Sequence, residues 1–218
     1  MSNLALYFVR HGESVANASD REGERRPEDS DRLSERGWEQ ARGLGRRLEG
    51  HGLEVIVASG MRRAQETAEG IAEVLGLPVE TDSDLYEVRQ SDAFFAASPD
   101  YGDTATMRWM PQSPRDFAEP GAESFDDVVA RVLRVQERLS ERAVSERVLA
   151  VSHWGFIHFF LGHALFGDAF QPSLLPGLYQ AAHANTGITI FEHRDRWMMD
   201  GSDYRGWVLE TWNDQAHL

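Results

Sequence analysis

An arginine and a histidine directly follow the first apolar run of the chain. Residues 4–9 read Leu-Ala-Leu-Tyr-Phe-Val, and Arg10, His11 and Gly12 come next. A guanidinium binds anionic oxygens with two N–H groups, a neutral imidazole can act as a nucleophile, and glycine allows a ligand to approach the backbone closely. These residue types predict a site for a phosphoryl group at the end of a buried strand. The alternative is an ordinary solvated Arg-His pair.

Two later apolar runs also end in residues that suit anion binding. Residues 53–58 lead into a predicted helix whose first turn holds Arg62 and Arg63, and residues 147–151 end just before His153. Open α/β sheets bind ligands at the carboxyl ends of their strands, and the free N–H groups of a helix N-terminus favour anions. We therefore expect three strand ends to share one polar edge, although one of the two arginines can be a solvated first-turn residue.

The remaining pattern alternates predicted strands and helices. Residues 18–32 are polar and are expected to form a mobile loop over the mouth of the site, and residues 88–120 lack a clear period and are expected to cover it. His158 and His163, five residues apart, do not have metal-pair spacing and are interpreted as packing residues or as residues that support the site without contacting a ligand. Helices are expected over 34–49, about 122–143 and 156–166, and further strands over 79–81, 185–192 and 206–211.

Composition limits the classes of chemistry. All 22 basic residues are arginine and the formal net charge is −14, so a broad nucleic-acid surface is not expected and P-loop, Schiff-base and Ser-Lys chemistry are excluded. The chain has no cysteine, which excludes disulfides and thiolate metal sites. No basic leader or long apolar run occurs, so a cytoplasmic protein without a membrane segment is expected. The 218 residues fit a single domain, residues 1–218, that includes the cover segment.

Several spaced motifs resemble the histidine phosphatase superfamily, also called phosphoglycerate mutase-like. The resemblance implies a three-layer α/β/α sandwich with a mostly parallel central sheet, and a phosphohistidine mechanism that needs neither metal nor cofactor. The motifs are Arg10-His11-Gly12-Glu13-Ser14 with Asn17, Leu33-Ser34 with Gly37 and Gln40-Ala41, Ser59 with Arg63-Ala64 and Thr67-Ala68, Leu85 with Glu87, Gly121 with Glu123-Ser124, Val151-Ser152-His153, and Asn185 with Gly187-Ile188.

The resemblance also implies roles for individual residues. His11 would be the nucleophile, Arg10 and Arg63 would bind the phosphoryl oxygens, and His153 would be the second histidine that donates to them. Asn17 matches a further phosphate contact found in part of the family. The residue types agree with these roles, because two arginine forks and a protonated His153 could neutralise phosphoryl charge as Mg²⁺ does elsewhere. A neutral His11 should donate its other ring N–H to a backbone carbonyl.

Glu87 matches the proton donor of the family. It would protonate the leaving alkoxide and then remove a proton from water; the alternative is a loop carboxylate paired with Arg89. The chain departs from the family at Trp154, where glycine is usual, and a large ring there could narrow the pocket or stack on a substrate.

The stretch of residues 88–92 also departs from the phosphoglycerate mutases. It lacks the Glu-Arg-His-Tyr-Gly sequence and downstream basic pair that those enzymes use to hold a second phosphate. We therefore expect a phosphatase acting on a small phosphorylated substrate, with no nucleic-acid or membrane partner. A phosphoglycerate mutase and a non-catalytic phosphate-binding regulatory domain are the alternatives. A homodimer is compatible with the sequence, and the oligomeric state and the substrate stay open.

Overall fold

A single six-stranded sheet forms the centre of the molecule. The computed structural model describes residues 4–24, 27–91, 110–142, 147–197 and 203–218. The strand order is β3-β2-β4-β1-β5-β6; the first four strands in this order are parallel to one another, β5 is antiparallel to β1, and β6 is antiparallel to β5. The mixed α/β fold with a mostly parallel sheet is therefore as predicted. The strands are β1 (Leu4–Arg10), β2 (Val55–Ala58), β3 (Val79–Thr81), β4 (Arg147–Ser152), β5 (Ile188–Trp197) and β6 (Asp203–Asp214).

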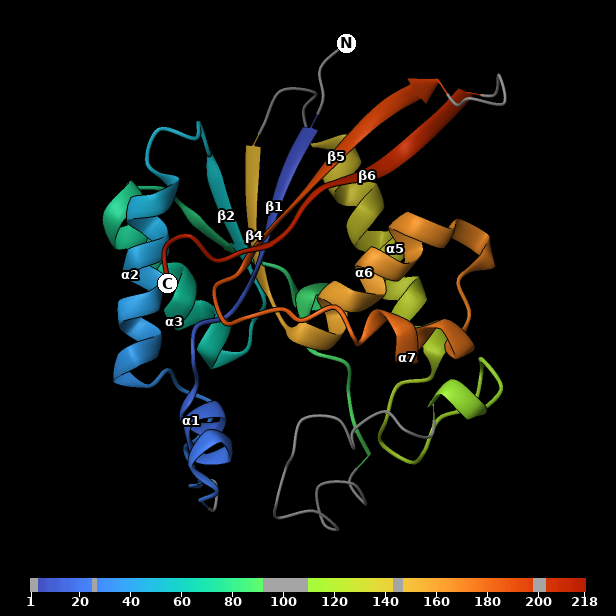
Figure 1. The fold of residues 1–218 in the computed structure, drawn as a ribbon, viewed down its shortest axis with the longest axis horizontal. Coiled ribbons are helices and arrows are strands. Elements are labelled where there is room, and N and C mark those ends of the chain that lie inside the picture. Colours follow the sequence, from blue (N-terminus) through green and yellow to red (C-terminus); the bar gives the residue numbers. More distant parts are fainter. Residues whose placement is uncertain (1–3, 25–26, 92–109, 143–146, 198–202) are drawn as a thin grey trace.

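Helices cover both faces of this sheet (Figure 1). Helices α2 and α3 pack on one face, and α5, α6 and α7 lie on the other. The described α-helices are α1 (Val15–Glu22), α2 (Glu35–Leu48), α3 (Arg62–Leu75), α5 (Phe125–Glu141), α6 (Trp154–Phe166) and α7 (Leu175–Leu178).

Alternation along the strands produces two buried clusters, because successive side chains point to opposite faces. In β1, Leu6 and Phe8 join the cluster under α5 and α6, whereas Tyr7 and Val9 join the cluster under α2 and α3. Helix α6 is apolar on nearly all sides, and Phe156, Phe159 and Phe160 are fully buried. Such a helix belongs inside a core rather than at its surface. A buried apolar cluster on each face of the sheet thus supports the strands that end at the site.

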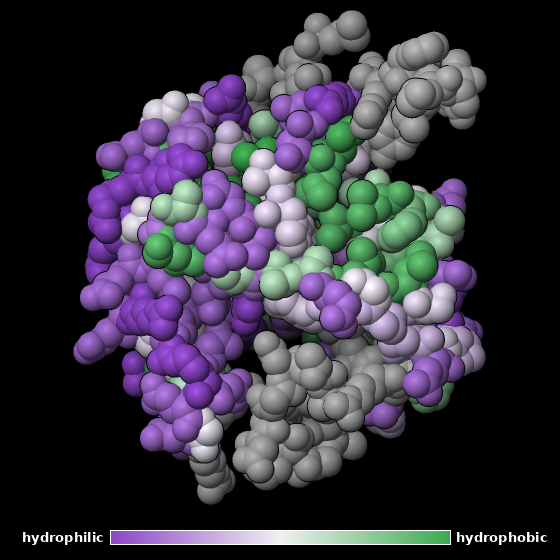
Figure 2. All heavy atoms as spheres, in the orientation of Figure 1, coloured by the Kyte–Doolittle hydropathy of each residue, from purple (hydrophilic) through white to green (hydrophobic). Residues whose placement is uncertain are grey.

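The two sides of the molecule differ in surface character. Figure 2 shows polar side chains over the α2 and α3 side, and apolar side chains gathered on the side of α6 and β6. Helix α2 has a narrow buried stripe that includes Ala41, Leu44 and Leu48. Its remaining positions are mostly charged, which is the pattern of a helix that covers one face of a sheet.

Helix α1 corrects the expected mobile loop over residues 18–32. Residues 15–22 are helical, and a capping box begins the helix: Ser14 accepts from the backbone N–H of Asn17, and the Asn17 side chain accepts from that of Ser14. The left-handed Gly23 ends it. The helix has a single buried residue, Ser19, so it lacks the apolar stripe that sequence analysis requires.

Two further expectations need adjustment. The helix expected from about residue 122 begins at Phe125 with Ser124 as N-cap, so Glu123 precedes it. Most of the expected cover over residues 88–120 lies outside the described residues, but Val88, its first residue, and Met110, the first described residue after the gap, belong to the core. Across the described ranges, no helix has the length and apolarity required to cross a bilayer.

Candidate active site

The ends of β1, β2 and β4 meet at one edge of the sheet. Arg10 pairs with Ser152 in the parallel ladder, and the N–H of His11 donates to the Ser152 carbonyl at 3.0 Å. The N–H of Ser59, which follows β2, donates to the carbonyl of Val151 at 2.9 Å. Parallel register therefore brings the residues that follow the three strands to one place, as the sequence predicts.

His11 is almost fully buried and its ring is held at both nitrogens. Its Nδ1–H donates to the carbonyl of Gly12 at 2.7 Å, and its Nε2 accepts from the Nε–H of Arg63 at 3.0 Å. The backbone contact is the one predicted for a nucleophilic imidazole. It leaves the lone pair on Nε2, which faces the guanidinium that would bind a phosphoryl group.

His153 lies beside His11, with the ring centroids 5.2 Å apart. Its Nε2–H donates to Ser59 Oγ at 2.8 Å, and its Nδ1 accepts from Nη2 of Arg63 at 3.1 Å. One guanidinium therefore contacts both imidazoles. His153 is also the N-cap residue of α6, so its backbone is fixed by strand β4 on one side and by the helix on the other.

The electrostatics of the two histidines favour their neutral forms. Burial, followed by the charges of Arg63 and Arg10, holds the pKa of His11 well below its ordinary value, against the raising effect of the Gly12 hydrogen bond. Burial and then Arg63 lower the pKa of His153 in the same way, with further contributions from His11 and Arg10. In the absence of a bound anion, cations and burial both disfavour a positive charge on His153, so the expected protonated His153 stays a prediction for the site with a phosphoryl group bound.

Arg63 is the hub of the cluster, and its partner Asp31 was not predicted. The guanidinium donates to the Asp31 carboxylate in addition to both histidines. Asp31 also accepts from the backbone N–H of Arg62 at 3.0 Å, at the start of α3. An anion that binds Arg63 must therefore compete with this carboxylate. Arg62 instead forms exposed ion pairs with Asp29 and Glu66, which makes it the solvated member of the two arginines.

The chain segment before β5 secures the end of β1. The guanidinium of Arg10 donates to the carbonyl of His183 at 3.0 Å, and the N–H of Thr186 donates to the carbonyl of Arg10 at 2.9 Å. The side-chain amide of Asn185 donates to the carbonyl of His11 at 2.8 Å. The predicted phosphate ligand Arg10 and the predicted nucleophile are thus fixed by the same short segment.

Asn17 lies next to this segment and serves α1. Its Oδ1 is within hydrogen-bond reach of the backbone N–H of Ser14, at 3.4 Å, and of the Asn185 amide, at 3.3 Å. It is therefore at the edge of the cluster and ties α1 to the segment that holds His11.

Glu87 contacts the start of α6 rather than Arg89. Its carboxylate accepts from the backbone N–H groups of Gly155, at 3.2 Å, and Phe156, at 3.1 Å. These residues lie two and three positions after His153, so the structure brings Glu87 to the same sheet edge as the two histidines. Free N–H groups at a helix N-terminus are suitable partners for a carboxylate.

Trp154 packs against protein side chains. Its ring lies 4.1 Å from that of His158 and 4.7 Å from that of Tyr179, between centroids. His158 is buried, with Nδ1 2.7 Å from the Trp154 carbonyl and Nε2 2.8 Å from the Ala181 carbonyl. The interpretation of His158 as a packing residue agrees with these contacts.

Three residues that contribute to this geometry were not predicted from the sequence: Asp31, Ser59 and Asn185. Asp31 lies in a stretch taken for a mobile loop, and its distance of 32 residues from Arg63 gives no local signal. Ser59 and Asn185 were part of the motifs without an assigned contact; their positions directly after β2 and before β5 are the signal that could have indicated one. Among the described residues, no group of three or more His, Asp or Glu side chains could hold a metal ion.

Comparison with known proteins agrees with the geometry. The sequence profile of the histidine phosphatase superfamily (branch 1) matches residues 6–215, nearly the whole chain. The chain belongs to this superfamily. Among its relatives are proteins named "Probable phosphoglycerate mutase GpmB": that of Salmonella paratyphi B is 30% identical, covering 99% of this chain and 95% of the relative. The protein of the same name from Erwinia tasmaniensis is 28% identical with the same coverage.

Solved structures similar to this chain include a phosphatase. A mycobacterial glucosyl-3-phosphoglycerate phosphatase is 26% identical with a TM-score of 0.69, and the match covers 98% of this chain and 100% of that chain. YhfR of Bacillus stearothermophilus is 27% identical with a TM-score of 0.70, covering 98% of both chains. The proteins similar to this chain thus include both a phosphatase and relatives named as probable mutases.

Proposed function

We propose that the protein is a metal-independent phosphatase that hydrolyses a small phosphomonoester through a phosphohistidine on His11. The observation that carries the proposal is the single guanidinium of Arg63 that contacts both imidazoles, at 3.0 Å from His11 and 3.1 Å from His153. Phosphoryl transfer mainly requires positioning and neutralisation of charge on the phosphoryl oxygens. A guanidinium beside a neutral imidazole supplies both.

In the first step Nε2 of His11 attacks phosphorus, and the bond to the leaving oxygen breaks. The Nδ1–H bond to the Gly12 carbonyl stabilises the positive charge that the imidazole acquires. Arg10, Arg63 and, at the rim, Asn17 bind the phosphoryl oxygens. His153 donates to them once the anion has raised its proton affinity, because a bound negative charge favours the cationic imidazole.

Glu87 is the proposed proton carrier. It donates a proton to the leaving alkoxide in the first step, and the resulting carboxylate removes a proton from the water that attacks the phosphohistidine in the second. The backbone N–H groups at the start of α6 orient this carboxyl group next to His153. Each cycle releases one alcohol and one inorganic phosphate and returns Glu87 to its protonated form.

The direct experiment is phosphate release from a panel of small phosphomonoesters in excess EDTA. Sugar phosphates, nucleotides and phosphoglycerates belong in the panel, and wild type is compared with His11→Ala. We expect release by wild type and none by His11→Ala. Loss of release on adding EDTA, or release by His11→Ala equal to wild type, would overturn the proposal.

Phosphoglycerate mutase is the second candidate function, and the names of the relatives favour it. The absence of a second-phosphate sequence after Glu87 supports the hydrolase instead. The two functions differ in their need for a bisphosphorylated primer. Interconversion of phosphoglycerates that requires such a primer, with negligible phosphate release, would establish the mutase.

A further inference from the structure

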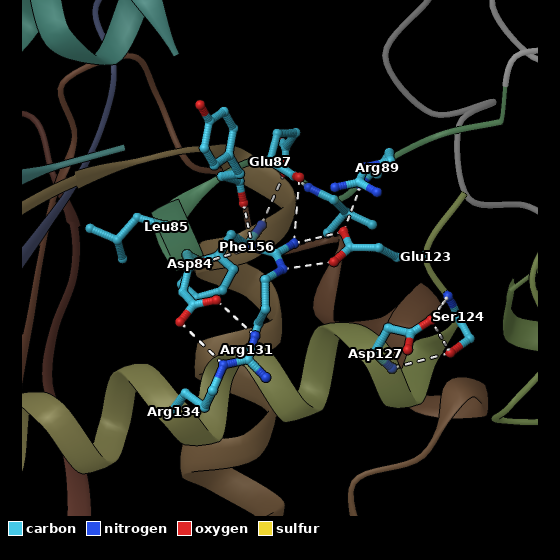
Figure 3. A network of polar contacts seen from close by, with 12 residues as sticks. Asp84, Leu85, Glu87, Arg89, Glu123, Ser124, Asp127, Arg131, Arg134 and Phe156 are labelled. Atoms are coloured by element: carbon cyan, nitrogen blue, oxygen red, sulfur yellow. Dashed lines mark hydrogen bonds and ion pairs between the residues drawn. The ribbon is translucent and has the colours of Figure 1, made fainter. Parts of the chain in front are cut away.

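Arg131 of α5 is a buried arginine that contacts the segment carrying Glu87 (Figure 3). Its guanidinium donates to the backbone carbonyls of Asp84, at 2.8 Å, Tyr86, at 2.7 Å, and Glu87, at 3.4 Å. The same group forms a two-point ion pair with the carboxylate of Glu123, at 2.7 and 2.8 Å. One side chain therefore fixes the backbone on the approach to Glu87.

Glu123 holds the same segment from the far side of Glu87. Its carboxylate accepts from the backbone N–H of Arg89 at 2.9 Å, and its own N–H donates to the Arg89 carbonyl at 3.0 Å. The next residue, Ser124, begins α5 through a capping box with Asp127. The position of Glu123 is thus set by the start of α5. Together, Arg131 and Glu123 form hydrogen bonds with the backbone on both sides of Glu87.

Glu87 hydrogen-bonds to the start of α6 at Phe156, a residue that Arg131 also contacts. The guanidinium of Arg131 lies over the ring of Phe156, 5.0 Å from its centroid, and the N–H of Phe156 donates to the Glu87 carboxylate. Residues 86–90 have no helix or strand of their own. Because no ladder register fixes this stretch, the position of its backbone depends on hydrogen bonds from side chains, and the contacts from α5 are among them.

We propose that the Arg131–Glu123 pair positions Glu87 for proton transfer, an inference that rests on the proposed function. Neither residue touches the reacting atoms, so both are positioning residues. A buried ion pair need not add to stability, whereas a guanidinium with several donors fixed in one plane restricts geometry closely. Lysine would keep the charge opposite Glu123 but could not reach the three carbonyls in the same arrangement.

The test uses the dependence of rate on the leaving group. Para-nitrophenol leaves readily without a proton, and phenol is a poorer leaving group that benefits from one. The readout is the ratio of kcat/KM for phenyl phosphate to that for para-nitrophenyl phosphate, measured on one preparation, so that any unfolded fraction cancels. The variants are Arg131→Lys, Glu87→Gln and the double variant. Arg134→Met is the control, because Arg134 is on the same helix and forms a half-exposed ion pair with the side chain of Asp84.

We expect Glu87→Gln to lower this ratio about 100-fold and Arg131→Lys about tenfold, through misplacement of the carboxyl group. The double variant should match Glu87→Gln alone, because Arg131 acts through Glu87. Arg134→Met should leave the ratio unchanged.

The acid role of Glu87 and the positioning role of Arg131 would be overturned by different results. A wild-type ratio in Glu87→Gln would overturn the acid role in the proposed function. A lowered ratio in Glu87→Gln together with a wild-type ratio in Arg131→Lys would overturn the positioning role alone. A ratio in Arg134→Met as low as that in Arg131→Lys would also overturn it, because any ion pair at this segment would then suffice.

Discussion

The histidines and Glu87 reach the same edge of the sheet by different means. Arg10, His11 and His153 are set by parallel strand register, with Arg10 opposite Ser152 and the N–H of His11 bonded to the Ser152 carbonyl. Glu87 lies on an irregular segment that a distant helix grips through Arg131. Changes at the strand ends should therefore lower the rate of phosphoryl transfer for every substrate. Changes to the Arg131–Glu123 pair should affect only proton delivery by Glu87.

The largest effect on activity should come from replacing Arg63, which contacts both histidines. Arg63→Met removes the donors to both imidazoles and one proposed phosphoryl ligand, so kcat/KM should fall about 1,000-fold for every phosphomonoester. Arg62→Met is the matched control, because its guanidinium pairs with Asp29 and Glu66 instead. Steady-state kinetics on both aryl phosphates measures the difference. Equal losses in the two variants would show that general charge, and not the contact with the histidines, matters.

The next prediction concerns the close packing of α2 against the residues that follow β1. A Cβ on Gly37 would lie 2.1 Å from the Glu13 carbonyl oxygen, so α2 can approach the residues after β1 only because this position is glycine. Gly37→Ala should lower the free energy of unfolding by about 2–3 kcal/mol. Gly43→Ala on the same helix has its nearest atoms at 3.8 Å and should raise it by about 0.5–1 kcal/mol. Urea unfolding that gives the two variants the same sign would contradict the packing argument.

His183 makes the segment that holds Arg10 sensitive to acid. Burial, with smaller contributions from His158 and Arg10, lowers the pKa of His183 to about 3. The unfolded chain takes up a proton near the ordinary histidine pKa of about 6.5, so the free energy of unfolding should fall as pH falls through this window. Between about pH 6.5 and pH 5 the contribution of His183 is about 2 kcal/mol. His183→Leu should show that much less loss in urea unfolding, whereas parallel pH curves would contradict the assignment.

The smallest effect should come from Ser59, which orients the second histidine. Ser59→Ala removes the acceptor 2.8 Å from Nε2 of His153, and kcat/KM should fall about tenfold for both phenyl and para-nitrophenyl phosphate. The ratio between the two substrates should stay at its wild-type value, unlike the ratio in Arg131→Lys. If Ser59→Ala changed the ratio of the two kcat/KM values, the strand ends could not be said to act separately from the Arg131–Glu123 pair.

The sequence predicts the strand ends well because an apolar run that stops at polar residues is a local signal. The apolar runs before His11 and His153 end at polar residues, and parallel pairing does the rest. Arg63 follows from its place in the first turn of α3. The helix α1 was missed because it depends on a capping box between Ser14 and Asn17 and not on apolar periodicity.

The contacts of Arg131 with the segment that carries Glu87 could not be predicted in the same way. Arg131 lies among the buried valines of an amphipathic helix, where a single arginine has no distinctive pattern, and its partners at Asp84 and Tyr86 are more than 40 residues away. The contacts are to backbone carbonyls, which carry no sequence signature. The ion pair between Asp31 and Arg63 was missed for another reason: the two residues lie 32 positions apart, and Asp31 was assigned to a loop.

The central claim is that His11 carries the phosphoryl group during turnover. The direct measurement is the intact mass of the enzyme after rapid mixing with para-nitrophenyl phosphate and an alkaline quench, which preserves phosphohistidine, followed by peptide mapping. Glu87→Gln is included because slower attack by water should increase the trapped fraction. We predict one added phosphoryl group located on His11 and none in His11→Ala. Phosphate release without any phosphoryl-enzyme, or a phosphoryl group located on another residue, would contradict the account.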